Sequence, residues 1–308
     1  MTSAFFTTND GDIVLRTGTE PDSKHDFRVH KFILSLASPV FKDMFTFPQP
    51  SDQTLHEQHQ LPVIDIPDPP KVLDAMLRFI YPGVEPPNVT ERQTLSALLM
   101  TADKYNITSI YPALRESLKA FLPFHSLWVY IIACRFGFSE EMRQAAKLTT
   151  PNGFLCLRDR GDIQLISSAD LFRLVQFVQE RQQGGRHIIE SHLGSLYLGR
   201  TTGCEHYEKD AQDYYLYLEK EVERAFAVNP CVESRDLFVI LDSIPDPPPG
   251  CDPLPKSADW YYGGGDEDAF QCPLQPMTIR RRLADIADEL ERRSDELLQK
   301  FFGSTGNV

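Results

Sequence analysis

Several features typical of membrane, secreted or nucleic-acid-binding proteins are missing from this sequence of 308 residues. It has no run of about 18 apolar residues, so no segment is expected to span a membrane. Its opening, MTSAFFTTNDGD, lacks the basic-then-apolar pattern of a secretory signal. Positive charge is also scarce, and the formal net charge is −13. Because nucleic acids and anionic membranes attract positive surfaces, we expect protein partners instead.

Cysteine is sparse, and the six cysteines are scattered through the chain. A chain of this length needs no covalent staples, so this pattern predicts free thiols in a reducing compartment, cytoplasmic or nuclear. No C-x-x-C pair is present to place two thiolates around a zinc ion. We therefore predict ordinary thiols, and no metal or cofactor. The alternative is a zinc site formed by Cys204, His206, Cys231, Cys251 and Cys272.

Recognisable catalytic motifs are absent as well. The stretch LGSLYLG around Ser195 does not have the G-x-S-x-G spacing, and there is no glycine-rich fingerprint that would cradle phosphates. His187 and His192 are five residues apart, so on a helix they diverge from a shared face. The sequence predicts no catalytic residue and no enzyme.

What the first third of the chain does contain is an alternation of strand and helix patterns. DIVL (12–15) and FRVH (27–30) flank a turn-forming segment and predict a β-hairpin, and VIDI (63–66) predicts another strand. Two short buried helices should follow the hairpin, the first burying a face made by Phe32, Ile33 and Leu36.

Helix starts are predicted from capping residues. Ser38 should cap the second short helix, with Pro39 at its first position and a buried face of Val40, Phe41, Met44 and Phe45. Three further caps are predicted at Asp68, at Thr90 with Gln93, and at Ser139.

In their order and spacing, five segments resemble the BTB/POZ domain: DIVL, FRVHKFILSLASPVFKDMF, VIDIPD, MLRFIYPG and LLMTADKYNITSIYPAL. The resemblance covers residues 10–122 and implies a small mixed sheet flanked by helices. It also implies that the residues matching the family motif have structural roles, and that His30 begins a helix. The matching residues are Asp12, His30, Lys31, Ser38, Phe41, Tyr81, Gly83, Ala102 and Asp103.

The rest of the chain is patterned as helices. SLWVYIIACRFGFSEEMRQAAKLT (126–149) resembles the helical extension of many fungal BTB proteins and, more loosely, the BACK region of animal adaptors. Proline and glycine crowd residues 243–276, which predicts an exposed, disordered segment. Residues 277–302 predict an amphipathic helix that either packs back on the helical domain or pairs with another chain; with fewer than four clean heptads, the first is favoured.

The predicted fold is therefore α+β, with an N-terminal BTB/POZ domain followed by an all-α region. Four parts are expected: the BTB/POZ domain (1–122), a BACK-like helical domain (123–242), the disordered segment (243–276) and the C-terminal helix (277–302).

The resemblance implies a scaffold or adaptor that self-associates or recruits protein partners. In some relatives the recruited partner is a cullin-based ubiquitin ligase. In such relatives a short hydrophobic-x-Glu pattern often accompanies cullin recruitment, and Leu55, His56 and Glu57 fit it. The favoured interpretation of these residues is nevertheless a polar insertion loop in which Leu55 is incidental. Animal BTB dimers typically have a helix ahead of the first strand that packs across the two-fold axis. Only about eleven residues precede the first strand here, which predicts that this helix is short or absent. A homo-oligomer and a monomer are therefore both possible outcomes.

By resemblance, the residues predicted to contact partners are Met44, Phe45, Phe47, Leu55, Glu57, Tyr105 and Ile107. An alternative function is a metal-stabilised or catalytic helical domain that carries the BTB portion as an interaction handle.

Overall fold

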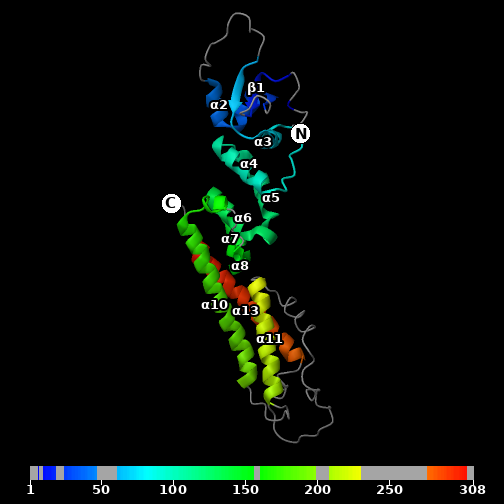
Figure 1. Ribbon diagram of the computed structural model, residues 1–308, viewed down its shortest axis with the longest axis vertical. Coiled ribbons are helices and arrows are strands. Elements are labelled where there is room, and N and C mark those ends of the chain that lie inside the picture. The colour runs from blue at the N-terminus through cyan, green and yellow to red at the C-terminus, as the bar shows by residue number, and fades with distance from the viewer. Residues whose placement is uncertain are drawn as a thin grey trace, which may run out of the picture. The chain divides into compact units, whose positions relative to one another are not determined.

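The computed structural model describes residues 6, 10–18, 24–46, 61–155, 160–198, 208–229 and 276–303. The chain divides into two compact units, Met1–Phe121 and Leu122–Val308 (Figure 1). Each unit is considered by itself below.

A three-stranded mixed sheet forms the centre of the first unit. Strands β1 (Ile13–Thr17) and β2 (His25–Val29) are antiparallel, which confirms the predicted hairpin. Strand β3 (Val63–Ile66) pairs parallel with the other edge of β1, giving the order β2-β1-β3. Leu15 on the middle strand is fully buried, as is Val29 on β2.

Helices complete this unit, and with the sheet they confirm the predicted α+β fold class. On the helix after β3, Leu73, Met76 and Leu77 form a face that is not exposed to solvent. The helical elements in chain order are α1 (Lys31–Ala37), α2 (Pro39–Thr46), α3 (Pro70–Ile80), α4 (Arg92–Lys104), the 3₁₀ turn η3 (Thr108–Ile110) and α5 (Tyr111–Lys119).

One of the four predicted helix caps is confirmed. The backbone N–H of Phe41 donates to Ser38 Oγ over 3.0 Å, so Ser38 caps α2 as its sequence position indicates. The caps predicted at Asp68, Thr90 and Ser139 are wrong, because α3, α4 and α7 each begin without a side-chain cap hydrogen bond.

The reason for these three differences is where each helix starts. Helix α3 begins one residue later than predicted, which leaves Pro69 in the cap position, and α4 begins at Arg92 after Glu91. Ser139 is itself the first residue of α7. The Asp68 carboxylate instead accepts hydrogen bonds from the end of α4, described below.

The second unit is built from helices. They are α6 (Leu122–Phe136), α7 (Ser139–Leu148), α8 (Pro151–Leu155), α9 (Arg160–Ile163), α10 (Ser168–Leu198), α11 (Glu208–Val228) and α13 (Pro276–Phe302). Helices α11 and α13 both run along α10 (Figure 1). Among the described helices, none combines the length and apolarity needed to cross a membrane.

Helix α13 packs back on its own unit, which is the favoured one of the two predicted alternatives. Near its end, the Phe302 ring meets Phe177 of α10 edge to face, with ring centres 5.4 Å apart. Further along α10, the Nε2 atom of His192 lies 2.8 Å from Oε2 of Glu289, and this contact lowers the pKa of the Glu289 carboxyl.

Two adjacent glycines in the middle of α10 allow its neighbours to approach closely. A Cβ atom at Gly185 would overlap the ring of Phe226, a buried residue of α11. At Gly184 the nearest atom is Nε of Arg293 at 3.6 Å, an ordinary van der Waals distance. Only Gly185 is therefore required for packing, although glycine weakens a helix at both positions.

This difference predicts opposite effects of the same substitution. Gly185→Ala should lower the free energy of unfolding by about 1 to 3 kcal/mol, because the Phe226 ring must move. Gly184→Ala should raise it by about 0.5 to 1 kcal/mol through improved helix propensity. Urea unfolding followed by circular dichroism measures both; equal effects of the two variants would contradict the packing described here.

Candidate interaction surface of the N-terminal unit

The start of helix α1 is fixed by two side chains from other elements. The backbone N–H of His30 donates to the hydroxyl oxygen of Tyr81 over 2.7 Å, and that of Lys31 donates to Oδ1 of Asp12 over 2.8 Å. A carboxylate at this end also complements the positive end of the helix. Burial raises the pKa of Tyr81 to about 12, so its hydroxyl stays protonated at neutral pH.

Helix α1 turns one apolar side chain inward and two outward. Leu34 is fully buried, whereas Phe32 and Leu36 are 71% and 73% exposed. These two residues lie four positions apart and share one face of the helix; we call them the α1 apolar pair. The prediction that Phe32 and Leu36 line a buried face is wrong, because α1 has apolar residues on more than one side and the core receives the side with Leu34.

Helix α2 is tied to the end of α4 by a buried hydroxyl. Ser38 Oγ donates to the backbone oxygen of Tyr105 over 2.5 Å while it accepts the Phe41 N–H. The Phe41 ring stacks on the Tyr105 ring with centres 4.6 Å apart. Met44 and Phe45, at the far end of α2, are half-buried, so part of each remains accessible.

The other predicted contact residues are distributed differently. Phe47, Leu55 and Glu57 lie outside the described residues. Tyr105 and Ile107 are only 3% and 0% exposed, which corrects the prediction for them: neither side chain offers accessible surface for a partner.

The reason for their burial is the turn that ends α4. Asn106 adopts a left-handed conformation with φ of +51°, and the Ile107 N–H donates back to the Ala102 carbonyl over 2.8 Å. This pattern is a Schellman motif, which folds the residues flanking the turn onto the helix. Tyr105 and Ile107 consequently pack inward.

Asp68 is the polar partner of this turn. Its Oδ2 accepts hydrogen bonds from the Tyr105 hydroxyl over 2.6 Å and from Lys104 Nζ over 2.8 Å. Burial, together with the hydrogen bond to Asp68, raises the pKa of the Tyr105 phenol.

The remaining family-motif residues also have local structural explanations. Gly83, just after α3, has a φ of +77°, a conformation that favours glycine. Ala102 is fully buried on α4, and the next residue, Asp103, is exposed.

Within the described residues no three or more His, Cys, Asp or Glu side chains gather as a metal site would require. The zinc alternative cannot be placed, because all five of its residues lie outside that part of the chain. What the first unit offers chemically is accessible apolar surface: the exposed α1 apolar pair and the half-buried side chains at the end of α2.

Tyr105→Phe should lower the free energy of unfolding at pH 7 by about 1.5 to 3 kcal/mol, the usual contribution of a hydrogen bond to a charged group. The raised pKa means that the Tyr105 contribution is complete below its ordinary value of 10 and is lost as the pH rises further. The difference between the variant and the unmodified chain should therefore narrow above about pH 10.

Urea unfolding at neutral and alkaline pH measures this difference. Tyr217→Phe serves as a control because Tyr217 is 43% exposed on α11. A constant difference at every pH would show that the Tyr105 hydroxyl is not held as described.

Comparison with known proteins identifies the family to which the N-terminal residues are similar. Residues 6–122 match the family model for the BTB/POZ domain. TD and POZ domain-containing protein 5 of Mus musculus is 34% identical over 86 residues, which are 28% of this chain and 23% of that protein. TD and POZ domain-containing protein 4 of Mus musculus is 32% identical over 95 residues, 30% of this chain and 24% of that protein. The chain thus spans about a quarter of these relatives. The predicted BTB/POZ resemblance is confirmed: residues 6–122 form a BTB/POZ domain.

Proposed function

We propose that this protein is an interaction scaffold or adaptor whose BTB/POZ domain self-associates through the α1 apolar pair. BTB/POZ domains are in general protein–protein interaction modules. The observation that carries the proposal is the exposure of Phe32 and Leu36 on one face of α1. Burying a large apolar side chain contributes about 1.5 to 3 kcal/mol, so covering this pair would favour association.

The geometry of α1 supports this use. Its first turn is held by Tyr81 and Asp12, and its inner face is anchored by Leu34. A surface that is already ordered loses little conformational entropy on binding. A contact between two copies related by a two-fold axis would also bring the same pair from each copy together.

The test is the solution mass of the chain measured by light scattering over a range of concentrations. We expect a dimer, and we expect Phe32→Ser with Leu36→Ser to produce a monomer. Phe172→Ser is the matched control, because Phe172 is also an exposed aromatic residue, 61% exposed, but lies on α10. A monomeric unmodified chain, or a dimer that survives the double substitution, would refute self-association through α1.

A cullin is the partner proposed for the end of α2. The accessible parts of Met44 and Phe45 support it, together with the sequence pattern of Leu55, His56 and Glu57. We propose that this region contacts the N-terminal domain of a cullin. Met44→Ala and Glu57→Ala should each weaken that complex several-fold in a light-scattering titration, whereas Phe172→Ser should not. A chain whose mass is unchanged by the cullin domain would argue against a ligase adaptor.

The description of the whole chain is also a proposal. We propose a non-catalytic adaptor of the cytoplasm or nucleus, of the fungal BTB type, in which the helices after residue 122 act as a BACK-like extension. The division at residues 122, 242 and 276 belongs to the same proposal. Residues 243–275 lie outside the described part of the chain.

A further inference from the structure

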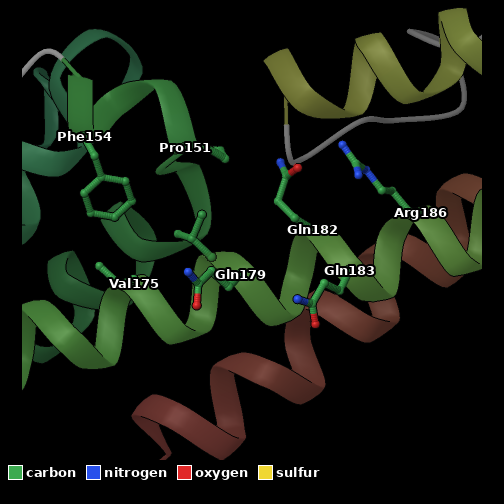
Figure 2. A pocket seen from close by; sticks show the side chains of 8 residues that line it. Pro151, Phe154, Val175, Gln179, Gln182, Gln183 and Arg186 are labelled. Carbon is green, nitrogen blue, oxygen red and sulfur yellow. The ribbon is translucent and has the colours of Figure 1, made fainter.

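The second unit contains a groove between α8 and α10 that the BTB/POZ domain does not explain. Its volume is about 410 Å³. Phe154 extends from α8 toward Val175 on α10, and Pro151 lies near them (Figure 2). Val178 also lines the groove. Further along α10 the lining becomes polar, with Gln182 and Arg186 projecting from the same side of the helix (Figure 2).

A buried arginine holds the helix before α8 against α10. Arg181 is only 2% exposed, and its guanidinium donates to the backbone oxygens of Lys147, over 2.6 Å, and Thr149. These carbonyls lie at the end of α7, two to four residues before α8 begins at Pro151. The two walls of the groove are therefore positioned by the fold itself, without a ligand.

The polar end of the groove carries a positive charge that the described residues do not neutralise. Arg173, earlier on α10, pairs with Asp170 at 3.1 Å, and the two terminal nitrogens of Arg181 donate to backbone carbonyls. Arg186 is exposed and forms no hydrogen bond or ion pair within the part of the chain that the structure describes. Next to it, the Gln182 Nε2 atom is inaccessible to solvent and has no hydrogen-bond partner among the described residues.

We propose that this groove binds a linear acidic segment of a partner protein. An apolar side chain of that segment would occupy the end formed by Phe154 and Val175, and an Asp or Glu carboxylate would pair with Arg186. This inference concerns the second unit and does not depend on the function proposed for the BTB/POZ domain.

Charge complementarity selects an acidic occupant even though the chain carries a net charge of −13. At physiological ionic strength, charges more than about 8 Å apart are largely screened, so distant carboxylates contribute little repulsion. A guanidinium binds a carboxylate with two parallel hydrogen bonds, and these are stronger than bonds between neutral groups. The local cation therefore decides which peptides bind.

Selection of a phage-displayed library of short random peptides on the full chain tests the proposal. We expect enriched peptides to combine an Asp or Glu with a nearby aromatic or aliphatic residue. In fluorescence anisotropy, Arg186→Glu and Phe154→Ala should each weaken binding of these peptides about tenfold or more. Arg281→Glu is the matched control, because Arg281 is an exposed arginine of α13 with the same change in charge. The Phe32→Ser, Leu36→Ser variant should bind them normally.

Three results would overturn the inference. The first is that the selection enriches no peptides on the unmodified chain compared with a variant that carries both Arg186→Glu and Phe154→Ala. The second is enriched peptides without acidic residues, or peptides that bind Arg186→Glu as well as the unmodified chain. The third is an effect of Arg281→Glu equal to that of Arg186→Glu, which would show a non-specific charge effect. A synthetic peptide of residues 259–270, DWYYGGGDEDAF, is also tested as a competitor of the selected peptides. If it competes, the occupant of the groove is this chain's own acidic stretch, and the proposed partner protein is ruled out.

Discussion

The packing of α2 against the end of α4 in the BTB/POZ domain depends on one buried hydroxyl group, that of Ser38. This oxygen accepts the Phe41 N–H in the first turn of α2 and donates its proton to the backbone oxygen of Tyr105 at the end of α4. Because Ser38 is fully buried, losing either bond would leave a polar group without water, at a cost of about 1 to 3 kcal/mol. The hydroxyl therefore links the start of α2 to the end of α4.

The same principle operates at the other end of α1. Backbone donors that the helix itself cannot satisfy are bonded by Tyr81 and by Asp12, which belong to distant parts of the sequence. His30 illustrates the consequence, since its backbone N–H makes the shortest contact and its ring Nδ1 lies 3.3 Å from the same hydroxyl. His30 therefore contacts the Tyr81 hydroxyl through both its backbone and its ring at the start of α1. Rigidity of α1 follows, and an exposed apolar pair on a rigid helix is suited to binding.

Sequence patterns predicted the hairpin, the helix capped by Ser38 and the α+β class, because these depend on local spacing of apolar and turn residues. They did not predict which side of α1 is exposed. Periodicity identifies apolar residues, but with Phe32, Leu34 and Leu36 in one short helix it cannot show which of them faces the sheet. Tyr105 and Ile107 were misassigned for a related reason: a left-handed Asn106, which only the backbone reveals, turns both side chains inward. The α10 groove left no sequence motif, since its walls come from separate helices.

The two proposed surfaces use different physical interactions, and this difference gives them different responses to salt. The α1 apolar pair would associate by removing hydrocarbon from water, which added salt does not weaken. The groove would select its ligand through Arg186, an exposed cation whose attraction for a carboxylate is screened as ionic strength rises. As the salt concentration rises, such an adaptor would stay assembled while its affinity for an acidic segment falls. Assembly through the apolar pair and recognition through Arg186 would then change independently as the salt concentration changes.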